Sequence, residues 1–530
     1  MKKSINFFSW FYQNWFTVLC TGLLLFIAFY PKIPLLELIP GYIVRVRLED
    51  FFLTGVLLVF GVLLVKKKVT IQTPITRILI GYVVVGILSM LSALFVVKSV
   101  PLDSFVHVEK MFLHFLRRLE YFTLFFLFYN AVKSFRHVRM VLIAAMIMIV
   151  GISVYGFGQK YLYWPVYSTM NREFSKGVKL VLTEHARVPS TFGGHYDMSA
   201  FIMFLLALTL SLVFLSRSKM EKACLVIVFV MGFWLLILGS SRSSFLAYLL
   251  AIGIVVLLIG VYKQSLWWVI SRGFVVFSFS MVVMLTLGDL SSRFTQLGIV
   301  QQVNNYLAAL QKPLAKQPDN SIKVEPITDT DQLPTPAQTS PPSTPTGKPL
   351  PGDVYTDIPD LKNVISTEDG KTVIGVIQVP RTYSACTEQY GLSACIRYDT
   401  LWPRAINGFL RNPLVGSGPS TLTKAVRNEF TEAESTDNDF LRTLGEVGIL
   451  GAITFYGPIF IFIWKAVEVL SKKPRGLVAA ILIGLIAGTL GMFINALYID
   501  VFAASKVAFM YWAMIGVGFA TIRLTYEKKK

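Results

Sequence analysis

The sequence predicts an all-α polytopic membrane protein with about twelve transmembrane helices and a large extracytoplasmic loop domain between spans nine and ten. Hydrophobic residues make up 54% of the 530 positions and charged residues only 15%. Apolar runs of about 20 residues recur along the chain, and each is long enough to cross about 30 Å of hydrocarbon as a helix. The runs are continuous rather than alternating, which favours helices over the strands of a barrel.

The apolar runs divide the chain into three parts. Residues 1–288 hold spans one to nine, residues 289–446 form the loop domain, and residues 447–530 hold spans ten to twelve. The fourth run is the least regular, because Arg117, Arg118 and Glu120 lie near its start. The predicted spans are residues 14–30, 49–65, 75–97, 113–132, 138–158, 197–215, 224–239, 245–261, 269–288, 447–469, 477–497 and 502–522.

Basic residues gather in alternate short connections, which predicts that those connections and both termini are cytoplasmic. This bias accounts for most of the net charge of +19, so we expect contact with the lipid bilayer and no nucleic acid as partner. The first span lacks a small-residue cleavage site and is predicted to be an anchor. The basic residues are Lys2, Lys3, Lys66, Lys67, Lys68, Lys133, Arg136, Arg139, Arg217, Lys219, Lys222, Lys263, Arg272, Lys472, Lys473, Arg475, Lys528, Lys529 and Lys530.

The same topology places two long loops outside. The first covers residues 159–196, and the second is the loop domain. Within the second, residues 311–351 are rich in Pro, Thr, Ser and Gln, which predicts a disordered linker. Residues 371–379 alternate like a strand. Residues 398–410 carry an apolar stripe at helical spacing, so we expect a helix along the membrane surface with Trp402 as interfacial anchor.

Two of the four cysteines, Cys386 and Cys395, lie close together in the second loop. An extracytoplasmic compartment is oxidising, so we predict a disulfide between them. The alternative, a metal site, lacks a CxxC pair or a nearby histidine. No metal site and no cofactor are therefore expected.

Four arginines stand out because they map to the outer face, against the usual bias of basic residues. They are Arg187, Arg242, Arg397 and Arg404. Guanidinium groups bind phosphate oxygens through paired, charge-assisted hydrogen bonds. Several converging arginines would therefore hold a pyrophosphate and stabilise it as it leaves. The alternatives are that Arg242 extends to the lipid headgroups, that Arg404 is an interface anchor, and that Arg187 and Arg397 are surface charges.

Carboxylates cluster before the tenth span. Asp437, expected in the first helical turn, is the candidate base that accepts a hydroxyl proton. Asp439 follows Thr436 by three residues, so a capping role competes with a catalytic one. Glu446 is expected to pair with an arginine. Gly445, Gly448 and Gly451 predict close helix packing. His195, near Asp197, is a candidate for proton transfer, with a structural role as the alternative.

Three segments resemble the O-antigen ligase and polymerase family of bacterial inner-membrane glycosyltransferases. They are RVPSTFGGHYD (residues 187–197), GSSRSSFL (residues 239–246) and residues 397–451, which include NPLVGSGP. The resemblance implies an inverting, metal-independent enzyme with an extracytoplasmic active site. It would move a glycan from a polyprenyl-pyrophosphate carrier to a glycan, lipid or protein acceptor. Carried over, Arg187, Arg242 and Arg397 would bind the pyrophosphate.

One position departs from the family pattern. Ligases of the family have a histidine where this chain has Asp437, followed by Asn438, and aspartate there is more typical of polymerase-like members. Either Asp437 accepts the proton, or another position activates the acceptor. Two other classes compete with the transferase: a transporter or flippase of lipid-linked sugars, and a non-catalytic assembly protein of the cell envelope. A transporter predicts broken or charged helices repeated in two halves.

Overall fold

The computed structural model describes residues 7–36, 45–102, 105–170, 174–286, 360–368, 371–379, 395, 397–422, 436–474 and 476–527. The chain divides into two compact units. The first unit comprises Met1–Phe294 with Tyr383–Lys530, and the second comprises Thr295–Thr382. The predicted boundaries of the loop domain stay a prediction.

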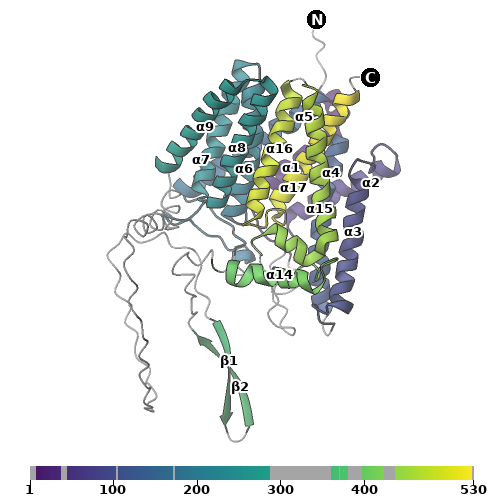
Figure 1. Ribbon diagram of the computed structural model, residues 1–530, viewed down its shortest axis with the longest axis vertical. Helices are drawn as coiled ribbons and strands as arrows, with labels where there is room; N and C mark the ends of the chain where they lie inside the picture. The colour runs from purple at the N-terminus through teal and green to yellow at the C-terminus, as the bar shows by residue number, and fades with distance from the viewer. Residues whose placement is uncertain are drawn as a thin grey trace, which may run out of the picture. The chain divides into compact units, whose positions relative to one another are not determined.

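The first unit is a bundle of long helices (Figure 1). The length and apolar composition of these segments explain why they are helices, since a helix satisfies its backbone hydrogen bonds internally where lipid offers no partner. The helices are α1 (Phe7–Phe29), α2 (Leu48–Val65), α3 (Thr76–Leu91) with the π-turn η1 (Ser92–Val96), α4 (Phe105–Ala131), α5 (Phe135–Tyr161), α6 (His195–Leu215), α7 (Lys219–Leu238), α8 (Arg242–Lys263), α9 (Leu266–Thr286), the π-turn η3 (Arg397–Leu401), α14 (Trp402–Arg411), α15 (Asp439–Ser471), α16 (Gly476–Ala496) and α17 (Ser505–Glu527). A short 3₁₀ turn, η2 (Phe174–Lys176), lies between α5 and α6.

Within the described residues, eleven helices are long and apolar enough to cross a membrane. Their positions agree with eleven of the twelve predicted spans. The remaining one corresponds to α4, which has 27 residues but carries charged residues in its first half. The structure thus confirms a multi-pass helical protein, while the count of twelve is not confirmed.

One end of the bundle, here called the lysine face, brings together the connections after α2, α4 and α15 with the end of α17. Lys67, Lys68 and Lys133 lie with Arg523 around one hollow. Arg523 donates to the carbonyl oxygen of Val132 at 2.8 Å. The predicted clustering of basic loops on one face is therefore confirmed for these segments.

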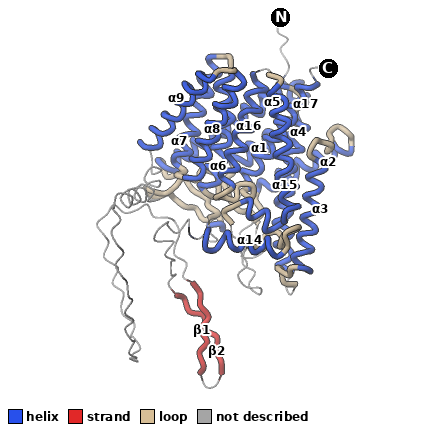
Figure 2. The backbone as a smooth tube through the Cα atoms, viewed as in Figure 1, coloured by secondary structure: helices blue, strands red, loops and turns tan. Residues whose placement is uncertain are grey.

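The opposite end, here called the loop face, carries most of the longer connections (Figure 2). Lys506 donates to the carbonyl oxygens of Ala28 (3.1 Å) and Thr191 (2.7 Å), so it joins the ends of α1 and α17 to the segment before α6. Figure 1 shows α14 lying across this end of the bundle. This agrees with the surface helix expected from the apolar stripe, although Ile406 of that stripe is 45% exposed.

The described residues of the second unit form an antiparallel hairpin. Strands β1 (Asp360–Glu368) and β2 (Lys371–Val379) pair in register from Asp360 opposite Val379 to Glu368 opposite Lys371. The strand predicted at residues 371–379 is thus confirmed, and β1 was not predicted. The Pro-rich linker at 311–351 and Cys386 lie outside the described residues. Cys395 is buried and disulfide-bonded, but its pairing with Cys386 stays a prediction.

Candidate functional site

Helix α15 begins at Asp439, before the predicted span at 447–469 but after Asp437, and Asn438 is its N-cap. The Asn438 side chain accepts from the backbone N–H of Leu441 at 2.9 Å. Two expectations are therefore wrong. Thr436 is not the cap, and Asp437 lies before the helix with a left-handed φ of 51°, a conformation that aspartate tolerates better than most residues. The carboxylate of Asp439 instead accepts from the N–H of Phe502 at 2.8 Å.

Helix α15 is interrupted at Gly448, where φ is 68° and ψ is −169°. Essentially only glycine adopts this backbone region. The break leaves helical N–H and C=O groups without partners inside the helix. The segment that follows α14 supplies them. Pro413 accepts from Ile449 N–H at 2.9 Å, and Gly418 N–H donates to the carbonyl oxygen of Glu446 at 3.0 Å.

This pairing explains why two glycine-containing motifs occur together. A Cβ on Gly448 would overlap the carbonyl of Leu414, and a Cβ on Gly416 would overlap the carbonyl of Glu446. Gly445 similarly faces the carbonyl oxygen of Ala405 in α14. The predicted close packing is thus confirmed for Gly445 and Gly448. Their partners are α14 and the segment after it, rather than another spanning helix.

Glu446 forms the centre of a buried ion-pair network just before the break. It lies 2.5 Å from Arg118 of α4 and 3.1 Å from Arg442 one turn earlier. It also accepts from the N–H of Ser420 at 3.0 Å. The carboxylate is buried, and such a charge is tolerated only when paired and hydrogen-bonded. The expected pairing of Glu446 with an arginine is confirmed.

Asp500, in the connection between α16 and α17, organises the turn before α15. Its two carboxylate oxygens accept from the N–H groups of Thr436 and Asn438, each at 3.0 Å. The Oδ2 atom that accepts from Thr436 also accepts from the Nη1 of Arg442 at 2.9 Å. Asp437 lies between the two anchored residues, and its carboxylate is 2.9 Å from Arg397. The structure therefore brings two predicted site residues, Asp437 and Arg397, into one ion pair.

A polar cavity of about 310 Å³ opens beside this turn. Its walls come from the connections after α1, α5 and α16, and from α4, α6 and α15. Among the described residues that line it, five lysine and arginine side chains outnumber two acidic ones, so its lining is predominantly positive. They are Lys32, Arg47, Arg117, Arg118 and Arg442, with Asp197 and Asp500.

Lys32 and Arg47 share a single buried carboxylate, that of Glu49. The distances to its Oε1 atom are 3.2 Å from Lys32 and 3.5 Å from Arg47. Burial, together with the charge of Arg47, lowers the pKa of Lys32 to about 8, while Glu49 opposes this shift. Two cations on one carboxylate leave excess positive charge at this wall. An anionic group could therefore bind there without displacing an existing ion pair.

The remaining predicted residues lie on the same face. Arg187 donates to the Oη of Tyr196 at 2.9 Å and lies 2.7 Å from the Nε2 of His195. Arg242 is the first residue of α8, where Ser241 caps the helix. Arg404 is half-buried in α14. The structure thus pairs Arg187 with His195. The convergence of three arginines on one pyrophosphate stays a prediction.

Sequence reasoning missed most of the cavity lining. Asp500 was not singled out, because its partners in the chain are 58 to 64 residues away. Arg117 and Arg118 were noticed only as irregularities of a span. The available signal was the presence of two adjacent arginines in an otherwise apolar helix, since ionisable residues at membrane depth are functional candidates by default.

Comparison with curated proteins finds no match to this sequence. The O-antigen ligase family model matches residues 226–456. The matched segment includes Arg242, Arg397, Asp437 and Glu446, whereas His195 and Asp500 lie outside it. Residues 226–456 of this multi-pass membrane protein thus match the O-antigen ligase domain, which supports the O-antigen ligase/polymerase family and glycosyl transfer as its general activity.

Proposed function

We propose that the protein transfers a glycan from a polyprenyl-pyrophosphate carrier to a glycan, lipid or protein acceptor at the extracytoplasmic face of the bacterial inner membrane. The observation that carries this proposal is the basic cavity on the loop face, beside the Asp437–Arg397 pair. The lysine face lies at the other end of the bundle. By the excess of basic residues in cytoplasmic loops, the loop face is then outside.

In this proposal the carrier pyrophosphate binds beside the wall formed by Lys32 and Arg47, which carries excess positive charge. The predicted ligands Arg187, Arg242 and Arg397 complete the binding of its oxygens. Fixed cations of this kind stabilise the negative charge that develops on a leaving pyrophosphate. The polyprenyl chain stays in the lipid beside the bundle.

The chemical step is a single displacement. An acceptor hydroxyl oxygen attacks the anomeric carbon of the donor sugar as the bond from that carbon to the pyrophosphate oxygen breaks. Asp437 accepts the hydroxyl proton, and the carrier leaves as polyprenyl pyrophosphate. Attack from the face opposite the leaving group inverts the anomeric carbon. Asp500 and Arg397 hold the Asp437 carboxylate in place, and His195 is the second candidate for proton transfer.

The test is a transfer assay in detergent with purified protein, a polyprenyl-pyrophosphate-linked oligosaccharide and EDTA, with products identified by mass spectrometry. Longer lipid-linked glycans indicate a polymerase. Carrier release that requires a second acceptor indicates a ligase. If no acceptor supports turnover while the donor still binds saturably, the proposal fails in favour of a transporter.

A matched pair of variants sharpens this test. Arg242→Ala should abolish transfer at normal protein abundance, because one of the cations that hold the pyrophosphate is lost. Arg411→Ala is the control, since Arg411 is an exposed arginine at the end of α14 on the same face. Equal loss in both variants would show that only the general surface charge matters.

A further inference from the structure

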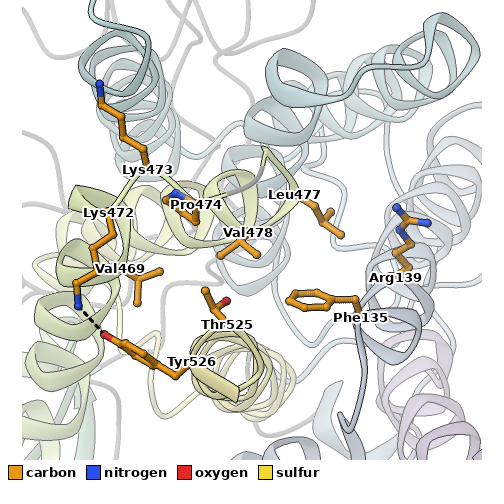
Figure 3. Close-up of a pocket in the computed structure, with 10 residues that line it drawn as sticks. All are labelled: Phe135, Arg139, Val469, Lys472, Lys473, Pro474, Leu477, Val478, Thr525 and Tyr526. Carbon is orange, nitrogen blue, oxygen red and sulfur yellow. Dashed lines mark hydrogen bonds between the residues drawn. The ribbon is translucent and has the colours of Figure 1, made fainter. Parts of the chain in front are cut away.

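Two further cavities lie away from the loop-face cavity. The first, of about 490 Å³, opens on the lysine face between the starts of α5 and α16 and the ends of α15 and α17. Figure 3 shows Phe135, Val478 and Thr525 around its middle, with Arg139 on one side and Lys472 on the other. Mostly apolar side chains thus line the middle of this cavity, and basic side chains lie at its sides, here called the rim.

The second cavity, of about 510 Å³, continues from the first, because Arg139 and Leu477 line both. It follows α5 from Arg139 to Gly151 and is almost entirely apolar. Twelve residues of helix cover about 18 Å, which exceeds half of the about 30 Å hydrocarbon thickness. The groove is therefore as long as the acyl chain of one lipid leaflet.

The charges at the rim are not all equally available. Lys472 donates to Glu468 (2.8 Å) and Tyr526 (3.3 Å), so its charge is already compensated. Arg139 and Lys473 are exposed, and neither forms an ion pair with another residue that the structure describes. Glu221, an acidic lining residue of the second cavity, accepts from the hydroxyl of Ser216 at 2.6 Å.

We propose that these two cavities together bind one anionic phospholipid from the leaflet at the lysine face. Its phosphate lies beside Arg139, Lys473 adds positive charge at the opposite side of the first cavity, and one acyl chain lies along α5 in the second cavity. Basic pockets between membrane helices bind anionic headgroups in this way. The charge complementarity and the length of the apolar groove select a phospholipid over a soluble anion, which would leave the groove empty.

The experiment compares phosphatidylglycerol with phosphatidylcholine of the same acyl chains, added to the detergent-solubilised full-length protein and followed by native mass spectrometry. The wild type should retain phosphatidylglycerol in preference. Each surface charge contributes about fivefold. The double variant Arg139→Gln/Lys473→Gln should therefore lower this preference about 25-fold. The control is Lys133→Gln/Arg136→Gln, whose exposed positions lie on the same face but line neither cavity. Equal loss in the control, or no preference in the wild type, overturns the proposal.

A second variant tests the acyl groove separately from the charge. Ile147 lines the second cavity and Val154 of the same helix does not, and the two are 48% and 45% exposed. Ile147→Trp should weaken retention of both lipids several-fold, because the ring fills the groove, while Val154→Trp should not. If the two variants behave alike, no chain occupies the groove and the proposal is wrong.

Discussion

Asp500 fixes the backbone on both sides of Asp437. Its carboxylate accepts one N–H bond from the preceding residue and one from the following residue, each at 3.0 Å. The turn is thereby held in a left-handed conformation that aims Asp437 at Arg397. Asp500 is thus a positioning residue for the proposed base, supplied by a connection more than sixty residues away in the chain.

The first prediction concerns Asp500→Asn. The amide keeps the shape but replaces one accepting oxygen by a donor, so one of the two backbone bonds is lost and the pairing with Arg442 weakens. We expect kcat to fall on the order of 100-fold, as small misplacements of catalytic groups do, with a smaller change in donor affinity. Transfer kinetics together with donor binding measure both quantities.

Asp439→Asn is the control for this variant. Asp439 contacts the same connection through the N–H of Phe502, but it does not bond the residues that flank Asp437. If both variants lower kcat equally at equal melting temperature, the effect comes from general loosening of the connection, and the positioning role of Asp500 is wrong.

The second prediction concerns Asp437→Asn. An amide cannot take up the proton of the acceptor hydroxyl, so kcat should fall by about 10²- to 10⁴-fold, while the donor still binds.

Arg397→Lys should instead weaken donor binding, since a lysine cannot form the paired hydrogen bonds of a guanidinium. Full turnover of Asp437→Asn would mean that another group, with His195 as the remaining candidate, activates the acceptor.

The membrane part of the fold was predictable because the bilayer imposes one length and one apolar composition on every span. Helix α4 was the exception. Its Arg118 and its Arg117 are paired with Glu446 and Asp50, and these partners belong to other helices, so sequence alone shows only charges in an unfavourable place. Pairing across helices removes the cost that makes such a helix look unsuited to the membrane.

The candidate site was predictable in its motifs but not in its geometry. Gly448 was predicted as a packing position, and Gly416 was noted only within a segment of family resemblance, whereas the two segments pair with each other across the break in α15. Hydropathy carries no information on such a break, because the apolar run continues through it. The position of Asp500 depends on tertiary contacts alone.

The third prediction concerns Gly448→Ala. The added Cβ meets the carbonyl of Leu414 and forces a backbone conformation that alanine rarely adopts, so we expect a cost on the order of 1–3 kcal/mol or more. Gly457→Ala in the same helix is the control. The new Cβ would be 3.6 Å from the Cγ2 atom of Ile78, which is an ordinary contact distance. Alanine also favours a helix by about 1 kcal/mol relative to glycine.

Thermal unfolding in detergent measures this difference. Gly448→Ala should lower the melting temperature, and Gly457→Ala should leave it unchanged or raise it. A normal melting temperature for Gly448→Ala would mean that α15 is continuous and that the segment after α14 does not complete its hydrogen bonds.

The fourth prediction concerns the pH dependence of donor binding through Lys32. Its pKa in the folded protein is about 8, below the usual value of about 10.4. The ammonium group is therefore present below about pH 8 and is lost as the pH rises through that value. Affinity for polyprenyl pyrophosphate should fall over this range, because the wall shared with Arg47 and Glu49 loses its excess positive charge.

Lys32→Arg separates this effect from other titrations, because a guanidinium stays protonated throughout the accessible range. Binding of polyprenyl pyrophosphate, measured between about pH 6 and pH 10, should weaken around pH 8 in the wild type and stay constant over that interval in the variant. Burial alone disfavours the charged lysine, whereas an anion bound beside it favours protonation, so the bound donor should move the midpoint upward. An identical decline in both proteins would assign the titration to another group and would remove Lys32 from the donor site.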